Sequence, residues 1–310
     1  MNIIFFGSDD FALASLERLF RSDVKVLACA TQPDKPKGRG MKVQPSAIKE
    51  FALKNKIPVL QPDSLRDDKV FEQLKAFQAD LFVVIAYGKI LPSEILSLPR
   101  IFCINVHGSL LPEYRGAAPI NWAIINGDQK TGVTVMKLNE TMDAGEIISQ
   151  REMDITDEDT AVSLRRKMAQ TGAELLLETI QAIVKRNFKL AQQDISKVTY
   201  APKLTRELGV IKWTEKAQTI HNLVRGLLPW PAAFTFYKGK RLRILETRLP
   251  EAKLPPSSKP GCVLGLNKTG ILVRTADGAI LVTRVHMEDS KPMEAHSFAI
   301  GHKLAAGHFL

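Results

Sequence analysis

The sequence predicts an α/β protein with a doubly wound, mostly parallel sheet, followed by a smaller C-terminal β-barrel domain of the OB-like type. In the first 188 residues, apolar segments alternate with amphipathic segments of helical spacing. The apolar segments are hydrophobic throughout, as in DLFVVIA at 80–86, which is typical of parallel strands buried on both faces. After residue 208 the segments become short, with Gly239, Gly270 and Gly278 at turns, which indicates a small antiparallel barrel.

The elements of the first part follow from apolar periodicity and from the residues that begin and end helices. The first strand leads into GSDD, where Ser8 or Asp9 is placed to cap a helix. Pro45 is expected in the first turn of a helix, and Gly127 is expected to stop another. We expect strands at 2–6, 24–31, 58–60, 80–86, 101–107, 132–138 and 146–151. We expect helices at 11–20, 45–56, 65–77, 117–126 and 160–187.

After residue 188 the alternation of apolar strands and amphipathic helices ends. Residues 189–208 are polar and aperiodic, so we expect a linker between a first domain at 1–188 and a C-terminal domain at 209–310. A helix at 214–227 opens the C-terminal domain. The expected barrel strands are 234–237, 242–249, 262–266, 271–275 and 279–285, and 250–260 is expected as an exposed loop.

Composition favours a cytoplasmic protein. No apolar run approaches the ~20 residues of a membrane span, and the N-terminal IIFF is too short for the core of a signal peptide. Cys29, Cys103 and Cys262 lie far apart in apolar contexts, which is typical of reduced core cysteines. No feature of the sequence requires a dimer, so we expect a monomer.

The positive charge is unevenly distributed. Through Phe188 there are 24 basic and 24 acidic side chains, whereas the rest of the chain has 19 basic and 9 acidic ones. The whole net charge of +10 therefore lies in the last third. Such an asymmetry suggests a polyanionic partner for that part, although solubility alone would also account for it.

A basic loop, DKPKGRGMK at 34–42, follows the second strand. It contains Lys35, Lys37, Arg39 and Lys42. Open α/β sheets bind ligands at the carboxyl ends of their strands, and a basic loop there suits a phosphate backbone. An ordinary solvated loop is the alternative.

Three polar residues are candidates for the chemistry. Asn105 and His107 end a strand, and their spacing of two points both side chains to the same face. Together they could hold a carbonyl oxygen as it gains charge. Asp143, in TMDAG between two strands, could orient His107 and move protons, although an aspartate near a glycine is also common in simple turns.

Other kinds of site lack their usual signatures. GSDD is not a GxGxxG loop, and its two acids would repel a pyrophosphate. Ser109 has no GxSxG context, and the histidines show no HExxH or similar metal spacing. We therefore expect no metal and a nucleophile that is brought by the substrate.

The segments NVHGSLLPEYRGAAPINWAIINGD and TGVTVMKLNETMDAGEII closely resemble the formyltransferases that use 10-formyltetrahydrofolate. The resemblance covers essentially the whole chain and implies a Rossmann-like catalytic domain. TQPDKPKGRG, YAPKL and PGCVLGLNKTGILVRTADGAI resemble the members of this family that formylate methionyl initiator tRNA. Two short motifs differ from the usual pattern: Gly-Thr-Pro is replaced by Gly7-Ser8-Asp9, and Leu-Asp-Thr-Gly by Met142-Asp143-Ala144-Gly145.

The resemblance implies roles for the candidate residues. Asn105 and His107 would stabilise the oxyanion of a tetrahedral intermediate, and Asp143 would relay the proton of the attacking amine. The folate co-substrate would contact Ser109, Leu110, Leu111 and Pro112, and 86–91 would help to line the pterin pocket. The tRNA would contact Lys35, Lys37, Arg39 and Lys42 and lie along the basic C-terminal domain.

Two other functions stay open. A formyltransferase that acts on an amino sugar nucleotide would share Asn105, His107 and Asp143, but not the basic loop or the basic barrel. A nucleic-acid-binding protein with an inactive transferase domain would not need those three residues at all. A folate-binding test separates this last alternative from an active enzyme.

Overall fold

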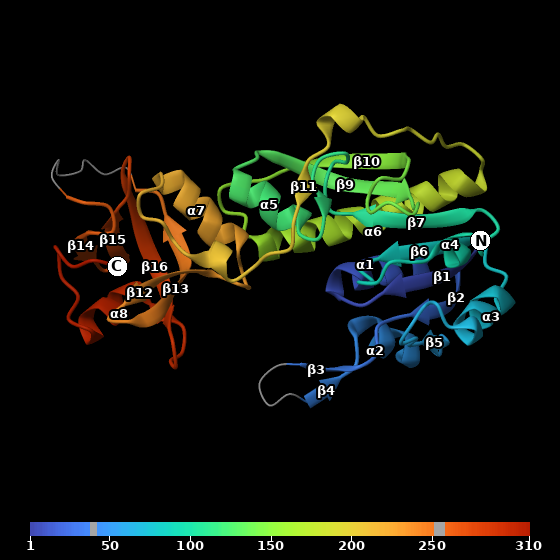
Figure 1. Cartoon of the computed structure of the whole chain (residues 1–310), viewed down its shortest axis with the longest axis horizontal. Helices are drawn as coiled ribbons and strands as arrows, with labels where there is room; N and C mark the ends of the chain where they lie inside the picture. The colour runs from blue at the N-terminus through green and yellow to red at the C-terminus, as the bar shows by residue number, and fades with distance from the viewer. Residues whose placement is uncertain (38–41, 251–257) are drawn as a thin grey trace. The chain divides into compact units, whose positions relative to one another are not determined.

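The computed structural model describes residues 1–37, 42–250 and 258–310 (Figure 1). The chain divides into two compact units. The first contains 1–119, 130–154 and 165–201, and the second contains 120–129, 155–164 and 202–310. No helix within the described ranges is long and apolar enough to cross a membrane.

The first unit is built on a seven-stranded sheet in the order β10-β9-β7-β6-β1-β2-β5. The strands are β1 (Asn2–Gly7), β2 (Lys25–Ala30), β5 (Val59–Leu60), β6 (Leu81–Ile85), β7 (Phe102–His107), β9 (Lys130–Lys137) and β10 (Ile147–Asp154). The pairings among β1, β2, β5, β6 and β7 are parallel, whereas β9 runs antiparallel to both β7 and β10. The expected mostly parallel sheet is therefore confirmed.

Helices cover both faces of this sheet. Consecutive side chains of the central strands, which point to opposite faces, are therefore both buried. Those helices are α1 (Asp10–Phe20), α2 (Ala47–Lys54), α3 (Asp68–Ala76), α4 (Ser93–Leu96) and α6 (Ala161–Val184), whereas nearly all of α5 (Pro119–Asn126) belongs to the second unit. On one face, Phe6 and Phe82 pack in a core with Leu74 of α3 and Ile95 of α4. On the other face, Gly172 lets α6 approach Val106 of β7.

The helix ends refine the expected boundaries. The Asp9 carboxylate accepts hydrogen bonds from two backbone N–H groups in the first turn of α1, which confirms it as a cap. Ser46 caps α2 in the same way, so Pro45 precedes that helix instead of lying in its first turn. Similarly, α3 begins only after its cap, Asp67, and not at Leu65. In both cases a side-chain oxygen fixes the helix start inside the expected range.

The segment expected to be a plain linker contains ordered structure. The short strand β11 (Tyr200–Ala201) pairs in parallel with β8 (Arg115–Gly116), and single 3₁₀ turns lie at Ile195–Lys197 and Glu207–Gly209. A pairing between segments so far apart in the chain leaves no local periodicity, which is why the sequence pattern misses it.

The second unit contains an antiparallel sheet. Its strands are β12 (Ala233–Tyr237), β13 (Lys240–Arg248), β14 (Val263–Asn267), β15 (Gly270–Arg274), β16 (Ala279–Met287) and β17 (Met293–Glu294), accompanied by α7 (Ala217–Gly226) and α8 (Ala295–Gly301). The strand order is β12-β13-β16-β15-β14, with β17 beside β16. Among the described residues no pairing joins β12 to β14. The antiparallel sheet is confirmed, and the closed OB-like barrel is not.

Tyr87 carries a polar atom in the core of the first unit. The side chain is buried against Phe6, and its hydroxyl has no hydrogen-bond partner within the described part of the chain. Burial raises the pKa of this hydroxyl to about 12. The hydroxyl therefore bears a desolvation penalty that no hydrogen bond offsets.

Replacing Tyr87 with Phe should raise the melting temperature. Removal of an unpaired buried hydroxyl should stabilise the fold by ~1 kcal/mol, which corresponds to roughly 2–4 °C for a unit of this size. Calorimetry measures the change. The matched control is Tyr237→Phe, which removes a hydroxyl that does donate to the carbonyl of His302, and which should lower stability. A lower melting temperature for Tyr87→Phe would mean that its hydroxyl has a partner in solution.

Candidate active site

His107 and Asp143 meet at the carboxyl end of β7. His107 is the last residue of that strand, and Asp143 lies in the connection between β9 and β10. The imidazole Nδ1 is 3.7 Å from the Asp143 Oδ1, and both side chains are largely buried, with 7% and 13% of their surface exposed. On the other side of the ring, Nε2 lies 2.9 Å from the carbonyl oxygen of Tyr114.

This geometry fixes the proton on one side of the His107 ring. A carbonyl oxygen can only accept, so Nε2 carries a hydrogen that it donates to Tyr114. Nδ1 faces the Asp143 carboxylate at an ion-pair distance, which is longer than a hydrogen bond. A second proton, on Nδ1, would lie between the ring and that carboxylate. The pair is thus arranged to hold and pass a proton.

The turn around Asp143 aims its carboxylate. The Asp143 Oδ2 accepts a hydrogen bond from the backbone N–H of Gly116, 2.8 Å away, while Oδ1 faces His107. Asp143 has a φ of 53°, in the left-handed region that non-glycine residues rarely adopt. At Gly145 a β-carbon would collide with the carbonyl oxygen of Lys137, so only glycine fits there. The sequence left two alternatives for Asp143, an ordinary turn residue or a carboxylate directed at His107. In the structure Asp143 is both.

Asn105 lies two residues before His107 on β7, on the same face of the sheet. Its side chain is half-buried and makes no hydrogen bond with any part of the chain that the structure describes. A half-buried amide at a strand end, with both its donor and its acceptor unused, is suited to bind a ligand.

The segment Ser109–Pro112 is held in shape by the neighbouring strands. Ser109 is fully buried, and its hydroxyl donates to the carbonyl of Glu113 at 2.6 Å. The Thr134 hydroxyl of β9 donates to the Ser109 carbonyl and accepts from the N–H of Leu111. The Gln150 amide of β10 donates to the carbonyl of Leu111.

The exposed surface of this segment comes from its other residues. Leu110 and Pro112 are half-buried, whereas Leu111 is buried. Leu110 packs against Gly132, where a β-carbon would not fit. Because the Ser109 hydroxyl is used inside the turn, Leu110 and Pro112 are the side chains of this segment that a ligand could touch.

Part of the basic loop forms a two-stranded hairpin. Lys35 and Lys37 lie in β3 (Lys35–Lys37), and Lys42 lies in β4 (Lys42–Gln44). Arg39 falls outside the described residues. The hydrogen bonds and ion pairs of the described part of the chain join His107 and Asp143 to each other and to the 114–116 segment.

The base of the hairpin is anchored by Asp34. Its carboxylate binds the Lys49 ammonium of α2 at 2.6 Å and accepts from the Gln61 amide at 2.8 Å. These two hydrogen bonds, that from Lys49 first, hold the pKa of Asp34 below its usual value. The sequence offered one sign of this anchor, a single acid in an otherwise basic loop.

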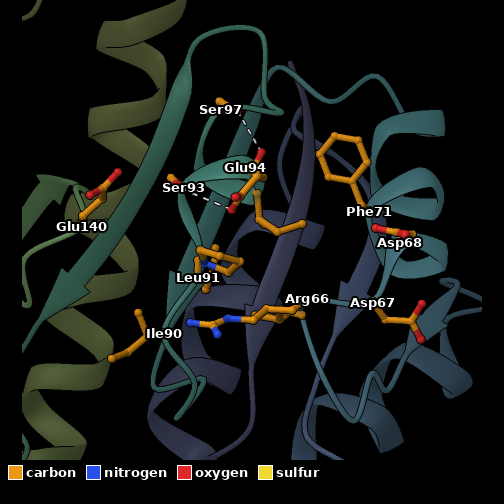
Figure 2. A pocket seen from close by; sticks show the side chains of 13 residues that line it. Arg66, Asp67, Asp68, Phe71, Ile90, Leu91, Ser93, Glu94, Ser97 and Glu140 are labelled. Carbon is orange, nitrogen blue, oxygen red and sulfur yellow. Dashed lines mark hydrogen bonds between the residues drawn. The ribbon is translucent and has the colours of Figure 1, made fainter.

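A cavity of about 820 Å³ opens beside the connection that follows β6 (Figure 2). Ile90 and Leu91 line it, and Figure 2 shows the Arg66 guanidinium extended toward them. Glu140, which precedes Asp143 in the β9–β10 connection, lines it as well. The remaining charged residues of the lining are Asp67, Asp68 and Glu94, so carboxylates outnumber the one guanidinium. The volume lies within the ~300–1,000 Å³ typical of small-molecule sites.

Within the described ranges, no group of three or more His, Cys, Asp or Glu side chains is placed to hold a metal ion. The structure also brings in residues that the sequence did not single out, namely Tyr114, Gly116, Thr134, Gln150 and Gln193. Most of them act through backbone groups or hold other residues in place. Such roles leave no mark in the spacing of polar residues.

Comparison with known proteins places the chain among known enzymes. Two family models match it, "Formyl transferase" over residues 1–180 and "Formyl transferase, C-terminal domain" over residues 203–303. A methionyl-tRNA formyltransferase of Acetivibrio thermocellus is 43% identical over 310 residues, which is 100% of this chain and 99% of the relative. Another, of Caldanaerobacter subterraneus subsp. tengcongensis, is 44% identical and is covered completely.

Solved structures share the fold at lower identity. A sugar 3N-formyl transferase, WlaRD, crystallised in the presence of dTDP and 5-N-formyl-THF, aligns with a TM-score of 0.69 at 19% identity, over 94% of this chain and 99% of that one. HypX from Aquifex aeolicus in complex with tetrahydrofolic acid aligns with a TM-score of 0.64 at 20% identity. The alignment covers 96% of this chain but only 46% of HypX.

Proposed function

Since the chain belongs to the formyl transferase family and, within it, to the methionyl-tRNA formyltransferases, we propose that it transfers the formyl group of 10-formyltetrahydrofolate to the α-amino group of methionyl initiator tRNA. The product is the N-formylmethionyl-tRNA used to begin translation, and we place the enzyme in the cytoplasm, where that tRNA is used. The observation that carries the proposal is the His107–Asp143 pair at the same strand end as Asn105, whose side-chain amide has no hydrogen-bond partner among the residues that the structure describes.

In the proposed reaction the amine nitrogen attacks the formyl carbon. A new C–N bond forms, and the carbonyl oxygen of the formyl group becomes an oxyanion. The Asn105 amide donates to this oxyanion. The Nε2–H of His107 donates to Tyr114 in the structure, and we propose that it is redirected to the oxyanion when the substrates are bound.

Collapse of the intermediate breaks the bond between the formyl carbon and N10 of the folate. The amine must lose a proton, and the leaving nitrogen must gain one. We propose that Asp143 accepts the first proton and passes it, through water, to N10, so the reaction needs no net proton uptake. The hydrogen bond from Gly116 supports this role because it holds one carboxylate oxygen and leaves the other directed at the site.

For the folate co-substrate we propose the surface formed by Ser109–Pro112 and by 86–91. Ser109 and Leu111 would shape that surface from inside, while Leu110 and Pro112 would touch the ligand. The cavity lined by Ile90 and Leu91 offers room for the pterin. Its carboxylates suit a ring that carries N–H donors better than they suit the negatively charged glutamate tail.

For the tRNA we propose that the hairpin cations Lys35, Lys37 and Lys42, together with Arg39, approach the acceptor end. The basic C-terminal domain at 209–310, joined to the catalytic domain at 1–188 by 189–208, would lie along the backbone. The net positive charge of that last third supports this assignment. We also propose a monomer, because all the groups assigned to catalysis come from one chain.

The reaction is tested by following formyl transfer from 10-formyltetrahydrofolate to methionyl initiator tRNA, with folate binding measured in parallel. We expect transfer to this tRNA and none to uncharged tRNA. Folate binding without transfer to the tRNA would contradict the proposal and favour an amino sugar nucleotide as the acceptor. A chain that binds tRNA but not folate would instead be an inactive transferase.

Replacing Arg39 with Ala should weaken tRNA binding and make it less dependent on salt. Loss of one phosphate contact should reduce the slope of log Kd against log salt concentration by about 1, while kcat at saturating tRNA should stay the same. Filter binding over a range of salt concentrations measures the slope. Lys25→Ala, at the opposite end of β2, is the matched control. An unchanged slope for Arg39→Ala would exclude a phosphate contact at this residue.

A further inference from the structure

We propose that Gln193 is a positioning residue, which holds the turn that carries Asp143 and thereby aims its carboxylate. Gln193 lies in the segment that the sequence predicts to be a linker. The inference rests on the proposed function, because it assigns Gln193 a role through the residue that would move the proton.

The Gln193 amide closes the Asp143 turn from outside. Its Nε2 donates to the carbonyl oxygen of Asp143 at 2.9 Å and to that of Gly145 at 2.8 Å. These two carbonyls bracket the turn in which Asp143 adopts its left-handed conformation. A non-glycine residue stays in that region only where its surroundings hold it, and both donors of a single amide do so here.

The oxygen of the same Gln193 amide is fixed by Arg115. Its Oε1 accepts from the Arg115 Nε at 3.0 Å and from the Nη2 at 2.7 Å. Arg115 is buried, with 9% of its surface exposed, so this fork is rigid. The next residue after Arg115 is Gly116, whose N–H holds the Asp143 carboxylate.

These contacts form a closed ring. Gln193 binds the backbone of the Asp143 turn and the side chain of Arg115, and the backbone that follows Arg115 binds the Asp143 carboxylate. Backbone hydrogen bonds between Ala191 and Ile147 keep the Gln193 segment alongside this connection. The ring therefore fixes both the turn and the direction of its carboxylate.

The variant Gln193→Glu isolates the donor half of the side chain. Glutamate has the same shape and still accepts from Arg115, but it cannot donate to the carbonyls of Asp143 and Gly145. We expect kcat to fall by roughly 10²-fold, as is typical when a reacting group is misplaced by about 1 Å, with KM for both substrates unchanged. Gln192→Ala is the control, because that neighbouring amide is exposed and, among the described residues, its side chain hydrogen-bonds to Glu146 alone.

A double-mutant cycle shows whether Gln193 acts through Asp143. In the background of Asp143→Asn, Gln193→Glu should cause no further loss of kcat, because the group that it positions has already been disabled. Losses that multiply would overturn the proposal, as would a kcat for Gln193→Glu equal to that of the Gln192→Ala control.

Hydrogen exchange tests the same contact without any assay of activity. In Gln193→Glu the N–H of Gly116 should exchange faster than in the wild type, because its acceptor is no longer held, while the capped first turn of α1 should exchange at the same rate. Unchanged exchange at Gly116 would overturn the inference. Absence of formyl transfer by the wild type would instead overturn the proposed function.

Discussion

Replacing Asp143 with Asn should reduce kcat by about 10²–10⁴-fold, the range typical for loss of a group that transfers protons. The substitution preserves shape, because the Asn carbonyl oxygen can still accept from the N–H of Gly116. Its amide, however, would face the Nδ1 of His107 as a donor. The neutral ring with its hydrogen on Nε2 would be favoured, and the amine proton would have no acceptor.

Single-turnover measurements separate this effect from substrate binding, and we expect folate and tRNA affinities to be retained. The matched control is Asp80→Asn, at the amino-terminal edge of the sheet, where the carboxylate accepts from the N–H of Asn2. A kcat for Asp143→Asn within a few-fold of the wild type would show that another group, or solvent, takes the proton.

Replacing Asn105 with Ala should reduce kcat by roughly 10²–10³-fold, as found when one oxyanion donor is removed. The loss should be confined to catalysis. Because the Asn105 amide bonds to no other described residue, its removal leaves no partner unsatisfied, and the melting temperature should hardly change.

To test this, kcat and the melting temperature are measured for Asn105→Ala and for the control Asn55→Ala. The amide of Asn55 at the end of α2 donates to the carbonyl of Phe51, so its loss should affect stability and not turnover. If Asn105→Ala lowers the melting temperature and kcat in parallel, Asn105 is a structural residue and the oxyanion must be stabilised elsewhere.

The sequence predicts the first unit well because the forces that define it are local. Strands such as Leu81–Ile85 are buried on both faces, so all their residues are apolar. Such a strand can be recognised in the sequence without knowing which strands pair with it. The spacing of Asn105 and His107 fixes their common face, and the cap at Asp9 is readable from the residues themselves. These predictions needed only periodicity and short-range hydrogen bonding.

The sequence misses what depends on distant partners. The pairing of β8 with β11 and the contacts of Gln193 join segments with no shared periodicity, so 189–208 looks like a plain linker. Five short strands can be predicted in the second unit. Whether they close into a barrel depends on which edge strands pair, and the local sequence pattern does not specify that pairing. The roles of Asn105, His107 and Asp143 likewise stay predictions until the variants are measured.

The pairing of β8 with β11 also bears on how the enzyme is made. The N–H of Tyr114 is held by Thr199, which lies 85 residues later in the chain. The ribosome synthesises about 5–20 residues per second, so Tyr114 emerges from it roughly 4–17 s before Thr199 does. During that interval the sheet can assemble, but the 114–116 segment beside His107 and Asp143 still lacks its contacts with Thr199 and β11. With His107 and Asp143 in their proposed roles, we therefore expect activity only after the last part of this unit has been synthesised.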